Sequence, residues 1–206
     1  TIQGQGSNET LIAKYNSSGD LQWNKTFGGT GQEYYNHIAS DGTNVYVSSY
    51  TNTSSQGWVV SKFNSSGGLV WQRGLGSGVT VTSASPFDME VDSSGDVYVV
   101  GYLIISGVTT GGNAVIAKWN SSGTLQWVNT FGGEYEEYCN RITSDSSSIY
   151  ICGRSKSARS PYDENDSFVA KLPIDGSAQG TYGNMSYFDI TSGAGAYTPN
   201  LISSNG

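Results

Sequence analysis

The residue types that most often perform acid–base or nucleophilic chemistry are scarce in this 206-residue chain, which has one histidine, His37, and two cysteines. A Ser-His-Asp triad or a histidine-containing zinc site would require His37. No nucleophile elbow and no His-x-x-x-His spacing surrounds it. We therefore expect His37 to be a structural or surface residue, and the sequence predicts no catalytic residue.

Carboxylates are the other candidates, because glycoside hydrolysis requires two of them about 5 to 9.5 Å apart. Asp41, Asp92 and Asp145 each lie next to a predicted turn and recur at the same place in successive segments. Such recurrence is typical of a turn-capping residue, whereas an active site occurs once. The acidic loop at residues 162–166 offers oxygen ligands for Ca²⁺, but it lacks the alternating spacing and the glycine of an EF-hand loop. The sequence therefore predicts neither a metal site nor a cofactor.

The two cysteines, Cys139 and Cys152, lie on the two predicted strands of one hairpin, whose turn is centred near residues 145–146. This spacing places them close to directly opposite each other. Cross-strand neighbours stand about 4.5–5.5 Å apart, a separation that a disulfide spans if both side chains share a face. Two buried free thiols are the alternative. A bridge would imply an oxidising compartment or an extracellular particle.

A segment that occurs three times, at residues 13–23, 61–71 and 117–127, organises the elements that hold these side chains. The copies share the pattern Ala/Ser-Lys-aromatic-Asn-Ser-Ser-Gly-x-Leu-x-Trp, and a diverged fourth copy begins at Ala170. Successive copies start 48, 56 and 53 residues apart. Each copy predicts a β-hairpin, because Asn and Ser side chains bond their own backbone in turns. The turn glycines supply the positive φ that a tight reversal requires: Gly19, Gly67 and Gly123.

A second type of hairpin follows each copy, with an aspartate before its turn and a Val-Tyr-Val-like strand after it. Four antiparallel strands in about 50 residues is the arrangement of a β-propeller blade, and helix signals are almost absent. The sequence predicts an all-β propeller, either a segment of a larger ring, which we favour, or an irregular four-bladed ring. The predicted units are the end of a preceding strand or connector at 1–9, blades at 10–56, 57–112 and 113–166, a partial diverged blade at 167–190, and a loop or linker at 191–206.

Aromatic residues fall into a repeating and a non-repeating group. Trp23, Trp71 and Trp127 repeat, and we expect them to pack between neighbouring blades. Non-repeating tyrosines are weaker candidates for stacking on sugars, since binding sites usually lie on the loops of a rigid scaffold. They are Tyr34, Tyr35, Tyr135, Tyr138, Tyr162 and Tyr182.

The composition limits the partners. The formal net charge is −7 and the pI is near 4.5, which argues against nucleic acid or an anionic membrane surface, because both attract Lys and Arg. No apolar run approaches the roughly 20 residues that span a bilayer, so we expect no membrane insertion.

The repeat resembles a known family. The hairpin pattern above, followed by Phe-Gly-Gly and then Asp-x-x-Gly-x-Val-Tyr-Val-x-Gly, resembles the bacterial β-propeller repeat called SBBP, which occurs in secreted and surface proteins. It is also similar to virion-associated proteins of marine cyanophages. Residues 169–177 with 180–183 resemble the end of the propeller array in those phage proteins. The chain departs from the family in its low repeat number and in Ser48-Ser49, where a glycine is usual.

The resemblance implies a non-enzymatic virion structural protein, in a fibre, knob or other surface projection, with the propeller as a rigid scaffold and a face for host glycans. The implied location is the virion surface or the extracellular space. Its partners would be other virion or surface proteins, copies of itself, and a cell-surface glycan. Two alternatives stay open. One is a secreted or cell-surface adhesion repeat protein of a bacterium or archaeon, with glycans on its eight Asn-x-Ser/Thr sequons. The other is a glycan-active enzyme, a glycosidase or lyase on a propeller fold.

Overall fold

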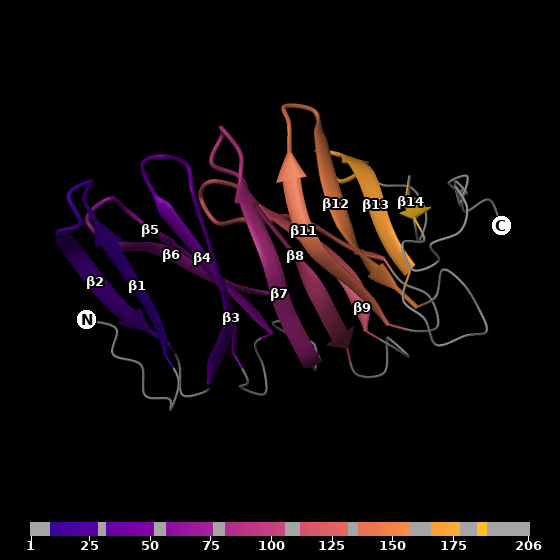
Figure 1. The fold of residues 1–206 in the computed structure, drawn as a ribbon, viewed down its shortest axis with the longest axis horizontal. Coiled ribbons are helices and arrows are strands. Elements are labelled where there is room, and N and C mark those ends of the chain that lie inside the picture. Colours follow the sequence, from indigo (N-terminus) through magenta and orange to yellow (C-terminus); the bar gives the residue numbers. More distant parts are fainter. Residues whose placement is uncertain are drawn as a thin grey trace.

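The protein is all-β in the part that the structure describes. The structure is a computed structural model that describes residues 9–28, 32–51, 57–75, 81–105, 112–131, 136–156, 166–177 and 185–188. These residues form 14 strands in four antiparallel sheets, and none of them is helical. They accordingly supply no helix that is long and apolar enough to cross a membrane. Figure 1 shows the sheets following one another in chain order from the N-terminal to the C-terminal side.

The first sheet has two strands and the other three have four each, in chain order. Sheet 1 contains β1 (Thr10–Tyr15) and β2 (Leu21–Phe27). Sheet 2 contains β3 (Glu33–Ser40), β4 (Val45–Thr51), β5 (Trp58–Phe63) and β6 (Leu69–Leu75). Sheet 3 contains β7 (Val81–Val91), β8 (Val97–Ile105), β9 (Asn113–Trp119) and β10 (Leu125–Phe131). Sheet 4 contains β11 (Glu137–Ser144), β12 (Ser148–Ser155), β13 (Asp166–Pro173) and β14 (Met185–Phe188).

The sheets are offset by one hairpin from the predicted blades. The prediction divides the chain after residues 56, 112 and 166, but β4 pairs with β5, β8 with β9 and β12 with β13. The chain instead passes from one sheet to the next between β2 and β3, between β6 and β7, and between β10 and β11. The hydrogen-bonded sheets therefore divide the chain at other strands than the predicted blades do, and the complete sheets have four strands each. A period of four strands is unchanged by any cyclic shift, so repetition alone does not show at which strand a sheet begins.

Turn chemistry accounts for the hairpins that carry the tryptophans. Asn64 Oδ1 accepts hydrogen bonds from the N–H groups of Ser66 and Gly68, at 3.0 and 2.8 Å. Gly67 has a φ of 76°, a left-handed conformation that glycine adopts without steric cost. Asn16 and Asn120 make the same bonds in the other two copies. The asparagine of each sequon-like Asn-Ser-Ser turn thus stabilises the reversal.

The apolar core consists of three clusters, each between two successive sheets. Ile12 and Phe27 of sheet 1 pack with Val47 and Phe63 of sheet 2. The largest cluster joins sheets 2 and 3, and a third joins sheets 3 and 4. Strand β8 is buried on both faces because Val97 and Val99 point to sheet 2, whereas Tyr98 and Val100 point to sheet 4. Each inner sheet is therefore sandwiched between its neighbours.

Candidate functional site

The repeated tryptophans lie at the junctions between sheets, each against the turn glycine of the next sheet. A Cβ built on Gly67 would lie 2.8 Å from Trp23 Cδ2, and one built on Gly176 would lie 2.5 Å from Trp127 Cδ2. The Trp23 ring N–H also donates to Ser65 O at 3.0 Å. Only a residue without a side chain allows this approach, so the contact couples one hairpin's tryptophan to the next hairpin's turn.

A second repeating contact joins the two hairpin types within each four-stranded sheet. Tyr46 pairs directly with Lys62 across β4 and β5, and Lys62 Nζ lies 5.1 Å from the centroid of the tyrosine ring. The Tyr46 hydroxyl donates to Asp41 Oδ2 at 2.8 Å. The same Asp–Tyr–Lys set recurs in the other two four-stranded sheets: Asp92, Tyr98 and Lys118, then Asp145, Tyr150 and Lys171.

The recurring aspartates lie at turns, where their carboxylate oxygens accept local hydrogen bonds. Asp145 Oδ1 accepts from the N–H groups of Ser147 and Ser148, both at 2.8 Å. Bonds from the Ser147 N–H, the Tyr150 hydroxyl and the Ser147 hydroxyl lower the pKa of Asp145 to about 2. Burial raises the pKa of Asp41, but hydrogen bonds from Asn44, Thr43 and Tyr46 outweigh it and hold that pKa well below its usual range. Carboxylates of this kind stay ionised and are poor general acids.

Two other carboxylates, Glu33 and Glu137, are buried, which the sequence did not indicate. The Ser155 hydroxyl donates to Glu137 Oε1 at 3.0 Å. Glu33 lies in sheet 2 and Glu137 in sheet 4, so sheet 3 comes between them in the chain order of the sheets.

His37 lies on β3 opposite Ser48, at the sheet position that Asp88 occupies on β7 and Arg141 on β11. Burial lowers the pKa of His37, while the charge of Asp88 raises it and that of Arg141 lowers it. Asp88 Oδ2 accepts the backbone N–H of Ile142 at 3.1 Å, across the junction between sheets 3 and 4. The carboxylate therefore caps the edge strand β11, and no described serine or cysteine nucleophile is hydrogen-bonded to His37.

The cysteines are free in the structure, and they are offset by one residue from direct opposition. Cys139 pairs with Gly153 and Cys152 pairs with Arg141, because a β-bulge inserts one extra residue in β11. The Cys139 thiol is fully buried and lies 4.0 Å from the Cys152 carbonyl oxygen. Burial, with a smaller contribution from Cys152, raises the pKa of Cys139 well above its usual value, so this thiol is unreactive.

Two of the tyrosines predicted as glycan ligands, Tyr34 and Tyr138, have side chains that the structure describes. The Tyr138 ring stacks on Tyr102, with ring centroids 4.7 Å apart, and the Arg154 guanidinium carbon lies 4.1 Å from its centroid. Both partners lie over the ring, where a sugar would stack. Tyr34 is 36% exposed, and its hydroxyl bonds Gln32 Oε1. The remaining candidates, Tyr135, Tyr162 and Tyr182, and the side chain of Tyr35, lie outside the described part of the chain.

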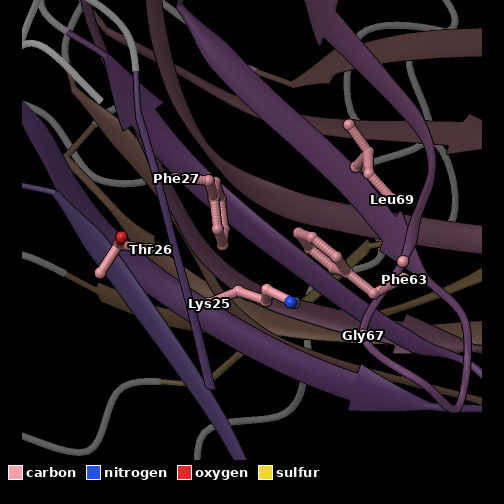
Figure 2. Close-up of a pocket in the computed structure, with 7 residues that line it drawn as sticks. Lys25, Thr26, Phe27, Phe63, Gly67 and Leu69 are labelled. Carbon is pink, nitrogen blue, oxygen red and sulfur yellow. The ribbon is translucent and has the colours of Figure 1, made fainter. Parts of the chain in front are cut away.

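A small cleft lies between β2 and the β5–β6 hairpin, where the first two sheets meet (Figure 2). Its volume is about 240 Å³, and it is lined by Lys25, Thr26, Phe27, Phe63, Gly67, Gly68 and Leu69. At the two later junctions the residue in the place of Lys25 bonds a turn carbonyl: Arg73 Nε donates to Gly123 O and Asn129 Nδ2 to Gly176 O, both at 2.9 Å. Lys25 makes no such bond to a described residue, and Figure 2 shows it extending toward Phe63.

A larger hollow, of about 640 Å³, lies at the turn ends of β7–β8 and β11–β12 and contains several acidic residues. Its carboxylates already have partners. Asp96 forms a 3.0 Å ion pair with Lys118, and Glu90 Oε1 accepts the Ser144 N–H at 2.9 Å. Nowhere in the described ranges do three or more His, Cys, Asp or Glu side chains form a group that could hold a metal ion.

Neither a protein-family model nor a curated protein matches the chain. Its function is therefore inferred from the geometry described above.

Proposed function

We propose that the chain is a non-enzymatic scaffold, a run of β-propeller blades within a fibre, knob or other surface projection of a phage particle. The observation that carries this proposal is the tryptophan-on-glycine contact, which recurs at three successive sheet junctions. Repetition of one contact favours the same packing geometry at each junction between sheets. A β-propeller is built of four-stranded antiparallel sheets packed in such a regular array. The resemblance of residues 169–177 and 180–183 to phage propeller arrays supports the virion context.

The state of the carboxylates favours a scaffold over the glycosidase or lyase alternative. A glycosidase holds one carboxyl protonated as a general acid, with a raised pKa. In this chain hydrogen bonds lower the pKa values of Asp41 and Asp145, and the same turn bonds recur at Asp92. Ionised carboxylates held in turns support the non-enzymatic scaffold.

The cleft beside Phe27 is the best candidate for a weak glycan contact. It places the exposed ammonium of Lys25 and the side chain of Leu69 over the buried Phe27 and Phe63, and the ammonium suits a sugar that carries an acidic group. Its volume is below the roughly 300–1,000 Å³ of sites that enclose drug-sized ligands, so a single contact would be weak. Many copies on one particle would supply avidity in place of affinity.

Mass spectrometry of purified virus particles from the source culture, together with immunogold electron microscopy, tests the virion assignment. The proposal predicts stoichiometric peptides of the chain and gold label on projections. Peptides found only in the host cell envelope would contradict it and support the adhesion alternative.

A glycan array with the purified chain, followed by turnover assays on every hit, tests the non-enzymatic assignment. Binding without a product, weakened by Lys25→Ala, is expected. Release of shortened or unsaturated sugars would establish an enzyme.

A further inference from the structure

Two buried polar side-chain atoms at the junction between sheets 2 and 3 are not paired by the protein itself. Trp58 on β5 and Ser48 on β4 are both 0% exposed. Neither Trp58 Nε1 nor Ser48 Oγ has a hydrogen-bond partner among the described residues. A buried polar group without a partner is costly, and native proteins commonly satisfy such groups with ordered water. The two atoms therefore point to a small bound molecule.

These two side chains are neighbours on one face of sheet 2. Ser48 pairs directly with Val60 across β4 and β5, and Trp58 lies two residues before Val60 on the same strand. Residues two apart on a strand point to the same face, so Ser48 and Trp58 are diagonal neighbours on adjacent strands. That face points to sheet 3, because Trp58 and Val60 belong to the apolar cluster between the two sheets. One small molecule between the sheets can therefore contact both polar atoms.

The facing part of sheet 3 offers backbone acceptors. A Cβ built on Gly101 of β8 would lie 2.9 Å from Trp58 Cζ2 and 3.0 Å from Pro86 Cα, so this edge of the indole lies against the backbone of sheet 3. The indole N–H is on the same edge, because Cζ2 and Nε1 are bonded to one ring carbon. His37, which stands opposite Ser48 on β3, donates to the Pro86 carbonyl, so the Ser48 side chain lies near the same segment.

The backbone of sheet 3 is irregular at this point. Pro86 has no N–H, and a β-bulge follows it in the pairing of β7 with β8 opposite Gly101. Buried backbone groups that do not pair within a regular ladder are commonly paired with side chains or ordered water. A carbonyl of residues 85–86 is therefore a suitable third partner for a molecule that bonds Trp58 and Ser48.

The next junction has neither polar atom. Register places Val100 of sheet 3 at the position that Ser48 occupies in sheet 2. It places Ala114 at the position of Trp58. Both residues are fully buried in the apolar cluster between sheets 3 and 4. At these two junctions the hydroxyl and the indole N–H are thus present together or absent together, as expected of two groups that bind one molecule.

We propose that the junction of sheets 2 and 3 binds one buried water molecule, which accepts the Trp58 N–H and donates to Ser48 Oγ and to a backbone carbonyl of residues 85–86. A buried water typically makes about three hydrogen bonds. This water links side chains of sheet 2 to the backbone of sheet 3, and so adds a polar contact to the apolar packing between them. The inference does not depend on the virion assignment.

A high-resolution crystal structure of the full chain tests the water site directly. We expect density for one water within about 2.5–3.2 Å of both Trp58 Nε1 and Ser48 Oγ, the range of ordinary hydrogen bonds. The Ser48→Val variant should lack this density. A dry site in the unmodified chain, or a Trp58 N–H that bonds a protein acceptor, would overturn the proposal.

Urea unfolding of Ser48→Val is a second test, whose sign depends on the water. With the water bound, valine removes one of its partners and leaves the Trp58 N–H unpaired, so the unfolding equilibrium constant should rise about fivefold or more. Without the water, valine removes an unpaired buried hydroxyl and should stabilise the chain. A neutral or stabilising effect of Ser48→Val would therefore overturn the proposal.

The matched control is the same substitution in a Trp58→Phe background, which has no indole N–H to leave unpaired. There, Ser48→Val should raise the unfolding equilibrium constant by a factor at least about two times smaller than in the unmodified chain. An equal rise in both backgrounds would mean that the valine methyl groups overpack the junction, and the water assignment would then be wrong.

Discussion

The Trp71 ring packs so closely on Gly123 that a Cβ at that glycine would lie 2.7 Å from Trp71 Cδ2. The ring N–H donates to Ser121 O at 3.2 Å, in the same turn. Gly123 has a φ of 81°, a left-handed conformation that favours glycine. Glycine is also needed here because a side chain would collide with the Trp71 ring. The two residues belong to sheets 2 and 3, so their contact helps to join these sheets.

Stability should depend on acid through the turn aspartates. The folded pKa values of Asp41 and Asp145 are lowered from 3.8, that of Asp145 to about 2. A lowered pKa contributes stability that is present above the unfolded value and is lost as the pH falls through the folded value. Urea unfolding should therefore show a free energy of unfolding that falls between about pH 4 and pH 2. Asp145→Asn should flatten this fall, and an unchanged slope in that variant would contradict the assignment.

Glu90 should protect the edge of the last sheet. Its Oε1 accepts the backbone N–H and the hydroxyl of Ser144, at 2.9 and 2.8 Å. Glu90→Ala leaves that N–H without its partner and should cost about 1–3 kcal/mol of unfolding free energy. Glu90→Gln keeps an acceptor and should cost less. Hydrogen exchange at the Ser144 amide should accelerate in Glu90→Ala, and equal exchange in both variants would argue against this bond.

Gly101 should tolerate no side chain. A Cβ at this position would lie 2.0 Å from Ser85 O, a backbone atom of the neighbouring strand. We expect Gly101→Ala to destabilise the chain by about 3 kcal/mol or more, the upper range for overpacking. Gly74→Ala is the matched control, because its nearest atom, Trp58 O, is at an ordinary 3.7 Å. It should change stability by less than about 1 kcal/mol in urea unfolding. Equal effects of the two substitutions would contradict the close approach of Ser85 O to Gly101.

The two thiols should differ in reactivity. Cys139 is fully buried with a raised pKa, whereas Cys152 is half-buried. Without reductant, a maleimide should label Cys152 first in the native chain and both thiols in denaturant. Mass spectrometry reads the number of labels. An unlabelled denatured chain would mean that a disulfide forms despite the one-residue offset of Cys139 and Cys152.

Local features were predictable from the sequence because they depend on short segments. The turn at Asn64 and Gly67 follows from residue types alone, and the position of Trp71 follows from repetition. The partner of Trp71 was not predictable, because Gly123 lies 52 positions further along the chain, in another sheet. The strand at which each sheet begins was not predictable for a different reason. A repeat of four strands looks the same whichever strand is taken as its first.

The candidate site was less predictable than the fold. Tyr138 reads as an exposed stacking residue, but Tyr102 and Arg154, from two other strands, cover its ring. The cleft beside Phe27 lies where Lys25 makes no hydrogen bond to a described turn carbonyl. At the two later junctions Arg73 and Asn129 each make such a bond. Comparing the copies position by position could have singled out Lys25, because Lys, Arg and Asn differ in reach and geometry.

The central claim, that tryptophan-on-glycine contacts join successive sheets, is tested most directly by comparing Gly123→Ala with Gly19→Ala in urea unfolding. Both glycines have a positive φ, 81° and 84°, so both variants carry the left-handed penalty of about 1–2 kcal/mol. Only Gly123 has a tryptophan above it, since nothing lies within 4 Å of a Cβ at Gly19. The account predicts that Gly123→Ala costs about 1–3 kcal/mol more than Gly19→Ala, and that Trp71→Ala removes this excess. Equal costs for the two glycine variants would contradict it.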